Sequence, residues 1–348
     1  MSKIKHITLN DIAQELNISK VAVSKALRNH PDISEATKKT VNATAAKLGY
    51  VPNYMARNLS SQRSNTIGLV VPKIAHHFMA EAIESIYETA YENDYEVILT
   101  VSQENAENEI KHIQTLLAMR VDGLLISVTE KTADYTIYET IKKRNVPLVF
   151  FDRVIEYLGF SCVTTTDEQG AFDAVEYLVN AGYKKIAHLG GYNFTNIGKY
   201  RMQGFKKAVE HFKLEIPEQW IVEGGYGEQS GYRGFKKIFK SGELPEVVFT
   251  VTYPVALGVI MAIEELELRI PEDIDIMCFG GSNYNHFVKP SLSFVRQPVQ
   301  DMGRKAVELL ISQIKDQQQQ VVNVQLPTDL VICETCLNKT GNHDYEQI

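Results

Sequence analysis

From Thr66 onward, short apolar runs alternate with longer amphipathic stretches, and this alternation limits the possible folds more than any other feature. The first series of runs is IGLVVP, YEVILTVS, VDGLLISV and VPLVFFD; the second begins near Cys162 and is CVTTT, KIAHLGG, WIVEGG, EVVFTVT and IDIMCFGG. Strands that alternate with helices predict parallel, doubly wound sheets. Two series predict an α/β body of two lobes, with a cleft at the carboxyl ends of their strands.

The charge of the chain is divided unevenly along its length. The net charge is −7, but residues 1–65 carry ten basic and four acidic residues, a net of +6, which leaves −13 for the remainder. A basic head on an acidic body predicts that only the head binds a polyanion such as DNA.

The composition excludes several classes of protein. With 348 residues, of which 44% are hydrophobic and 23% charged, the chain is neither disordered nor collagen-like nor a coiled coil. No apolar run approaches the roughly 18 to 20 residues that span a bilayer. The N-terminus lacks the apolar core of a secretory signal, and four cysteines are too few for a disulfide framework. We therefore expect a cytoplasmic protein of two or three domains.

The head shows the start signals of three short helices. Thr8, Ser19 and Ser34 are capping residues that precede LNDIAQEL, KVAVSKALR and EATKKTVNATAAKLG, and the third helix is expected to end at Gly49. The turn between the first two is short, so the pattern favours a helix-turn-helix. A small helical bundle without a ligand is the alternative. The outward face of the second helix is basic and lacks an acid, which favours DNA binding.

Several motifs of the head, in one order, resemble the LacI/GalR family of bacterial transcription regulators. They are T-L-x-D-I-A from Thr8, V-S within the second helix, L-G-Y at the end of the third, then P-N-x-x-A-R-x-L and T-I-G-L-V-V-P. The resemblance implies a helix-turn-helix head, a hinge helix and a body like the periplasmic binding proteins, acting as a homodimer on a palindromic operator. Repression is the family's usual outcome.

The resemblance implies domain boundaries as well. They are 1–50 for the helix-turn-helix, 51–65 for the hinge helix and linker, 66–335 for the two-lobed effector-binding and dimerisation domain, and 336–348 for a tail. Within the body, the N-lobe is expected at about 66–162 plus 291–327, and the C-lobe at about 163–290. The segment SFVRQPVQDMGRKAVELLISQI resembles the family's return to the first lobe.

The resemblance also implies roles for residues of the head. The expected base contacts are Lys20, Val21 and Lys25, and the expected DNA-backbone contacts are Thr8, Ser19, Ser24 and Asn29. Lysine can donate to guanine acceptors, whereas valine offers only apolar contact, for example with a thymine methyl group. Because the family more often has arginine at the position of Lys25, a single ammonium predicts weaker discrimination of guanine.

The segment PNYMARNL, residues 52–59, matches the family's hinge helix. Its expected minor-groove and hinge residues are Asn53, Ala56, Arg57 and Leu59. Leu59 matches the leucine that wedges into the central base step, and such an apolar wedge bends the duplex. Ordinary core packing of Leu59 is the alternative.

The cleft both keeps and departs from the family's pattern. Asp152, Arg153 and Arg201 match, and Tyr226 falls where an aromatic side chain is frequent; Tyr253 and Gly280 stand where the family usually has aspartates, and an acid is shifted to Asp167. The expected effector-binding residues are His76, His77, Phe78, Asp152, Arg153, Arg201, Tyr226, Tyr253 and Ser282. Fewer carboxylates beside retained cations predict an anionic effector, such as a sugar phosphate or sugar acid, because guanidinium forks hold anions.

Other interpretations remain open. Asp152 and Arg201 could form an ion pair between the lobes instead of binding an effector. The regulator could respond to a protein partner or to no small molecule, and a sugar-binding transport protein is a more remote alternative. An inducer and a corepressor are equally compatible with the sequence.

Nothing in the sequence suggests catalysis, a cofactor or a metal site. The phosphate-binding, dinucleotide-binding, nucleophile-elbow and zinc-protease motifs are absent. His76 and His77 are adjacent and would point in different directions on a helix. Cys333 and Cys336 have the spacing of a metal or redox pair but lack a second ligand pair, which favours two reduced structural thiols.

Overall fold

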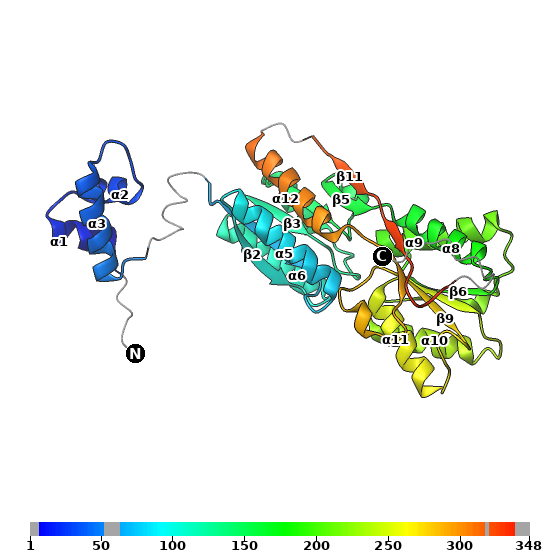
Figure 1. Cartoon of the computed structure of the whole chain (residues 1–348). Coiled ribbons are helices and arrows are strands. Elements are labelled where there is room, and N and C mark those ends of the chain that lie inside the picture. The colour runs from blue at the N-terminus through cyan, green and yellow to red at the C-terminus, as the bar shows by residue number, and fades with distance from the viewer. Residues whose placement is uncertain (1–6, 52–62, 317–319, 338–348) are drawn as a thin grey trace. The chain divides into compact units, whose positions relative to one another are not determined.

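The computed structural model describes residues 7–51, 63–316 and 320–337. Its chain divides into two compact units, Met1–Ser64 and Asn65–Ile348, which we call the head and the body (Figure 1). The predicted hinge residues Asn53, Ala56, Arg57 and Leu59 lie outside the described residues.

The head consists of the three predicted helices, α1 (Leu9–Leu16), α2 (Lys20–Leu27) and α3 (Glu35–Leu48). Each begins at its predicted cap, because the hydroxyls of Thr8, Ser19 and Ser34 accept hydrogen bonds from backbone N–H groups of the first turns. The helices share a small core formed by Ile12, Val23, Ala26, Val41 and Ala45. The helix-turn-helix prediction is thus confirmed.

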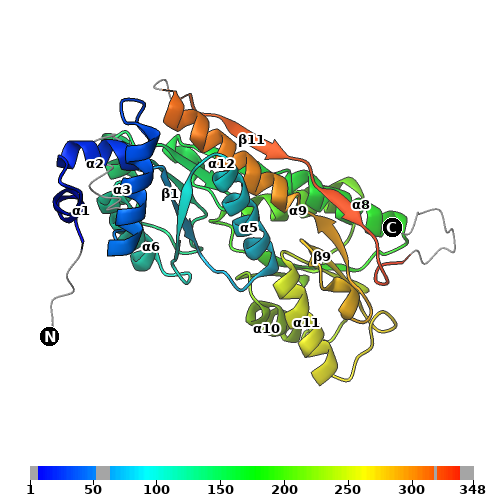
Figure 2. The same ribbon diagram turned by 60° about the vertical axis from the view of Figure 1, so that its left-hand side comes forward.

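The first lobe of the body is built on a six-stranded sheet in which all neighbouring strands are parallel. In spatial order its strands are β11 (Asn323–Leu326), β5 (Ser161–Thr165), β4 (Leu148–Phe151), β3 (Gly123–Ile126), β1 (Thr66–Val71) and β2 (Glu96–Val101). Helices α5 (His77–Glu92) and α12 (Val299–Lys315) cover one face and lie side by side (Figure 2). Helices α6 (Ala106–Met119) and α7 (Thr136–Lys143) cover the other.

The second lobe repeats this plan with an antiparallel strand at one edge. In spatial order its strands are β12 (Asp329–Val331), β10 (Ser293–Arg296), β9 (Asp275–Phe279), β8 (Val247–Thr250), β6 (Ile186–Gly191) and β7 (Ile221–Gly224), of which only β12 is antiparallel to its neighbour. Helices α10 (Glu228–Phe239) and α11 (Tyr253–Glu265) cover one face. Helices α8 (Asp167–Asn180) and α9 (Asn196–His211) cover the other. Both lobes are doubly wound, as predicted.

The structure corrects the lobe boundaries at two strands. β5 pairs with β4 and therefore belongs to the first lobe, whereas the sequence suggested that it opens the second. β10 pairs with β9 and belongs to the second lobe, although the returning segment was expected to begin at 291. An apolar run predicts a strand but carries no information about the strand beside it. The lobe to which β5 and β10 belong is therefore known only from their observed pairing.

Candidate functional site

The outward face of α2 is the first candidate site. Lys20 and Val21 lie in the first turn of α2 and are exposed, Val21 over 64% of its surface. Lys25 lies one turn further, with 35% of its side chain exposed. The first turn of α2 contains no acidic residue. The helix therefore presents two ammonium groups and one apolar side chain, a set that suits the edges of bases in a major groove.

Lys25 has a partner within the head that the sequence did not predict. Its Nζ donates to Oδ2 of Asp32 at 2.8 Å, and Nδ1 of His30 lies 3.4 Å from the same oxygen. The hydrogen bond from Lys25 and its charge lower the pKa of Asp32 below the usual value. The contact orients the lysine, and it must be released or shared when the ammonium meets a base.

The expected DNA-backbone residues are surface positions with local structural roles. The hydroxyls of Thr8 and Ser19 cap α1 and α2, and the Thr8 hydroxyl also donates to Asp11 Oδ2 at 2.7 Å. The Ser24 carbonyl accepts from Arg28 Nε at 3.1 Å. Asn29 is exposed and adopts a left-handed φ of 55° just after α2. As a cap, the Ser19 hydroxyl accepts a hydrogen bond, so its proton can still be donated to a phosphate oxygen, whereas the Thr8 hydroxyl already donates its proton to Asp11.

The second candidate site is a cavity between the lobes, at the carboxyl ends of the strands. It encloses about 680 Å³ of empty space, part of which opens to solvent. Eight of the expected effector residues line it: His76, His77, Phe78, Asp152, Arg153, Arg201, Tyr226 and Tyr253. Ser282 is not among the lining residues, although its neighbour Gly281 is, and its hydroxyl accepts from the Tyr284 N–H at 3.1 Å. Lining residues that sequence reasoning missed include Lys73, Glu104, Phe279 and Gln297.

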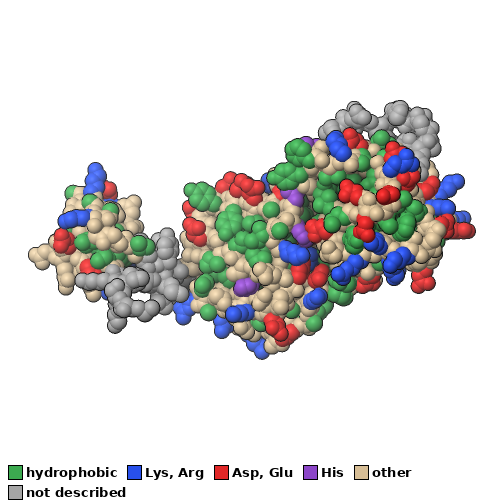
Figure 3. Space-filling view, turned by 90° about the horizontal axis from the view of Figure 1, so that it is seen from below, with side chains coloured by type: hydrophobic (Ala, Val, Ile, Leu, Met, Phe, Trp, Pro, Cys, Tyr) green, Lys and Arg blue, Asp and Glu red, His purple; other side chains and the backbone are tan. Residues whose placement is uncertain are grey.

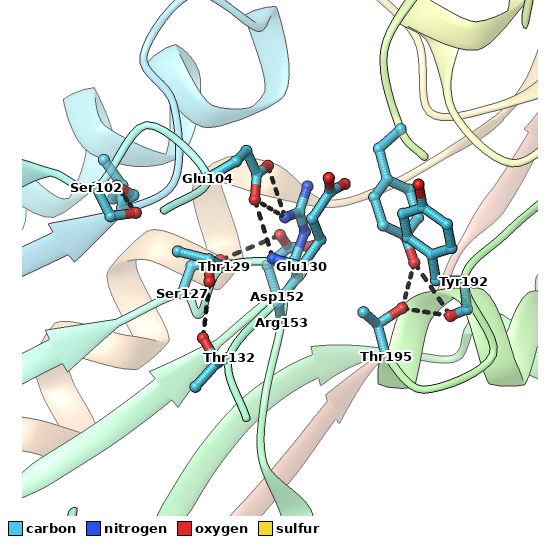
Figure 4. A network of polar contacts seen from close by, with 12 residues as sticks. Ser102, Glu104, Ser127, Thr129, Glu130, Thr132, Asp152, Arg153, Tyr192 and Thr195 are labelled. Atoms are coloured by element: carbon cyan, nitrogen blue, oxygen red, sulfur yellow. Dashed lines mark hydrogen bonds and ion pairs between the residues drawn. The ribbon is translucent and has the colours of Figure 1, made fainter. Parts of the chain in front are cut away.

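Arg153 is held on the first-lobe side of the cavity by Glu104. Its Nη1 donates to both carboxylate oxygens, at 2.8 and 3.0 Å, and the backbone N–H of Glu130 donates to the same carboxylate (Figure 4). The guanidinium carbon lies 4.6 Å from the centre of the Tyr226 ring, which comes from the second lobe. Nε of Arg153 is buried without a hydrogen-bond partner among the described residues. Nothing in the sequence pattern placed Glu104 in the cavity, because it lies outside the helices and strands, in a turn where its φ is 56°.

Arg201 makes a buried ion pair with Asp167 inside the second lobe. Its Nε donates to Asp167 Oδ1 at 2.8 Å, its Nη1 donates to the carbonyl of Val251 at 2.7 Å, and both charged side chains are at most 3% exposed. The guanidinium carbon lies 3.8 Å from the ring centre of Phe279. The alternative of an ion pair between Asp152 and Arg201 is therefore wrong. Asp167, the acid that departs from the family's pattern, is thus the partner of Arg201, which matches that pattern.

Asp152 carries a buried carboxyl group in an unusual backbone conformation. Its φ is 58°, and Oδ2 accepts a long hydrogen bond of 3.4 Å from the Ser127 hydroxyl. Burial raises its pKa to about 6, although the charges of Arg153 and Arg201 lower it in part. This carboxyl group is thus close to half-protonation in mildly acidic solution.

Within the described part of the chain, the histidines and cysteines show no metal-binding arrangement. Among the described residues, no group of three or more His, Cys, Asp or Glu side chains could hold a metal ion. His76 precedes the first turn of α5, and burial lowers its pKa. His77 Nε2 accepts from the Asn283 N–H at 3.2 Å. The Cys336 thiol donates to the carbonyl of Ile276 at 3.3 Å.

Gly280, where the family usually has an aspartate, lies at the cavity in a left-handed backbone conformation. Its φ is 76°, in the left-handed region that favours glycine, and an added Cβ would lie 3.2 Å from Gln297 Oε1. A side chain at this position would be strained.

A helix-turn-helix unit joined to a two-lobed α/β body with a cleft defines a class of DNA-binding transcription regulators. The comparisons agree: residues 8–53 match the model for bacterial regulatory proteins of the lacI family, and residues 175–336 match a periplasmic binding protein-like domain. The chain belongs to the LacI family. The described residues contain no helix long and apolar enough to cross a membrane.

Two similar sequences and one similar solved structure agree with this assignment. Catabolite control protein A of Priestia megaterium is 32% identical over 92% of this chain and 97% of its own length. The HTH-type transcriptional repressor PurR of Pasteurella multocida is 30% identical over 93% of this chain and 97% of its own. The lac repressor dimer bound to operator and the anti-inducer ONPF aligns with a TM-score of 0.83 and 26% identity, covering 96% of this chain and all of that one. The chain is a transcriptional repressor of this family and not an enzyme.

Proposed function

We propose that the chain represses carbohydrate-related genes as a homodimer on a near-palindromic operator, under the control of an anionic small molecule in the interlobe cavity. Two heads related by a two-fold axis would read two half-sites. The lac repressor structure, described as a dimer bound to operator, supports this assembly through its close structural similarity.

The exposed cations of α2 support DNA binding by the head. Lys20 and Lys25 lie on one helix face with Val21 between them. On the face of the body shown in Figure 3, basic and acidic side chains are intermixed, so that this face offers no continuous basic track for a duplex. The proposal assigns base contacts to α2 and minor-groove contacts to the segment that includes Leu59.

One observation carries the proposal of an anionic effector: donors without protein partners face the same cavity. Nε and Nη1 of Arg201 are occupied, but its Nη2 has no hydrogen-bond partner among the described residues. Lys73 also lines the cavity, and the first turn of α5 contributes His77, Phe78 and Met79 with no acid and no side-chain cap. The Arg153 guanidinium offsets the charge of the Glu104 carboxylate at the cavity wall. Spare donors at a helix N-terminus favour an anion.

The test is a calorimetric titration of the full-length chain with glucose, glucose 6-phosphate and glucuronate. We expect heat of binding only with the phosphorylated or acidic compounds, and weaker binding after Lys73→Gln, which removes the charge and leaves a polar side chain one bond shorter. Lys143→Gln, at an exposed position on α7, is the matched control. Tight binding of neutral glucose alone would refute the anionic effector.

A second titration tests the coupling between the cavity and DNA. Operator affinity and effector affinity must change by the same factor, because linkage is reciprocal. Measuring operator binding with and without the effector gives both the size and the sign of the effect. Mapping the bound sites in the genome would then show whether neighbouring genes concern carbohydrates.

A further inference from the structure

Asn196 joins the two lobes through both ends of its side-chain amide. It is the first residue of α9, in the second lobe, and it is 6% exposed. Nδ2 donates to the backbone carbonyl of Asp152 at 2.8 Å, and Oδ1 accepts from the backbone N–H of Val154 at 3.0 Å. Both partners belong to the loop that follows β4 in the first lobe. The Asn196 amide therefore makes one donated and one accepted hydrogen bond to the backbone of the other lobe.

The two segments that meet at Asn196 are each fixed within their own lobe. In the second lobe, the Thr195 hydroxyl donates to the carbonyl of Tyr192 at 2.8 Å and accepts from the Gly198 N–H at 3.2 Å. An added Cβ on Gly198 would lie 2.3 Å from the Tyr192 carbonyl oxygen, so the backbone of this turn packs closely against the start of α9.

The first-lobe loop is tied to its own sheet in a similar way. The Asp152 N–H donates to the carbonyl of Val163 at 3.1 Å, and the carbonyl of Arg153 accepts from the Val128 N–H at 3.2 Å. Figure 4 shows Asp152 and Arg153 on one side of the cleft and Thr195, which directly precedes Asn196, on the other. The amide thus links two stiff segments rather than two mobile loops.

We propose that Asn196 is a positioning residue that holds the lobes together without an effector and keeps Asp152 and Arg153 at the cavity wall. Opening the cleft breaks two buried hydrogen bonds at once, and a buried N–H or carbonyl left without a partner is costly. Only an amide supplies a donor and an acceptor in one plane, so neither aspartate nor alanine can replace it. An effector in this cavity, which rests on the function proposed above, would bind lobes already held close.

Hydrogen exchange of the full-length chain, followed by mass spectrometry of overlapping peptides, tests the role of Asn196 without DNA or ligand. In Asn196→Ala, exchange at the Val154 amide should accelerate about 25-fold, since each of two lost bonds changes a local equilibrium by a factor of about five. Asn196→Asp, which can accept from Val154 but not donate to Asp152, should accelerate it as well. Asn193→Ala is the matched control, because Asn193 bonds to Glu223 within the second lobe and should leave Val154 protected.

Exchange at a second backbone amide, that of Asn283, distinguishes opening of the whole cleft from a purely local loss of hydrogen bonds at Asn196. The Asn283 N–H donates across the cleft to His77 at 3.2 Å, away from Asn196 in the sequence. If Asn196 holds the lobes together, exchange at Asn283 should also rise in Asn196→Ala and not in Asn193→Ala. Unchanged exchange at Val154, an equal rise in the control, or a rise at Val154 without one at Asn283 would overturn the proposal. Circular dichroism of each variant shows that it is folded, and none of these outcomes depends on the identity of the effector.

Discussion

Replacing Asp152 with asparagine should stabilise the body at neutral pH and have a much smaller effect at pH 4. Burial raises the pKa of Asp152 to about 6 in the folded protein, whereas an unfolded aspartate has a pKa of about 3.9. The folded state therefore favours the protonated form. The stability that this group contributes is fully present below about pH 3.9 and is lost as the pH rises to about 6. Asparagine resembles the protonated form and loses nothing over that range.

The size of the effect follows from the difference between the two pKa values. A shift of about two units corresponds to about 3 kcal/mol at pH 7, and a little over about 2 kcal/mol of it develops between pH 4 and pH 7. Asp152 is only 7% exposed, so solvent screens this cost little. Any difference in hydrogen bonding between the two side chains is nearly independent of pH and cancels when the two pH values are compared.

The measurement is urea unfolding of the full-length chain and of Asp152→Asn at pH 4, 5, 6, 7 and 8, followed by circular dichroism. The difference in the free energy of unfolding should grow from pH 4 to pH 7 and then stay level. Asp94→Asn removes the same charge from an exposed position and controls for the change in net charge. A difference that is equal at pH 4 and pH 7, or that shrinks as the pH rises, would refute the reasoning.

Three further predictions concern the head, the ion pair and the hinge. Lys25→Ala should weaken operator binding by about 1–3 kcal/mol and relax sequence preference if the ammonium donates to a base; equal losses on operator and random DNA in binding titrations would make it a phosphate contact. Asp167→Asn should destabilise the body by about 3–5 kcal/mol in urea unfolding, because it leaves Arg201 buried without its counterion; an unchanged midpoint would contradict this. Leu59→Ala should reduce operator bending in gel-mobility assays, and unchanged bending would remove the wedge assignment.

Local signals explain how much of the fold could be predicted. A cap such as Thr8 and its helix lie within a few residues of each other, so the sequence shows both together. The apolar runs of the body are equally local, and the doubly wound lobes follow from their alternation with helices. The predicted lobe assignments of β5 and β10 were wrong because strand pairing, which decides them, joins residues far apart in the chain.

The candidate cavity was predicted in part for the same reason. Asp152 and Arg201 could be placed near the cleft because both match the family's pattern, and both line the cavity. Their partners could not be foreseen: Arg201 meets an acid 34 residues earlier in the chain, and Arg153 meets one 49 residues earlier. The Asn196 amide, which reaches backbone atoms rather than a side chain, leaves no trace in the sequence pattern at all.

The sequence by itself determined the kind of most elements, the division of charge between head and body, and the family, because periodicity, capping and motif order are properties of short stretches. The tertiary structure alone decided which carboxylate meets which guanidinium and how the lobes are joined. Those outcomes depend on contacts between residues distant in the chain. Such contacts form only once both sheets have assembled and burial has made each unpaired charge or amide costly.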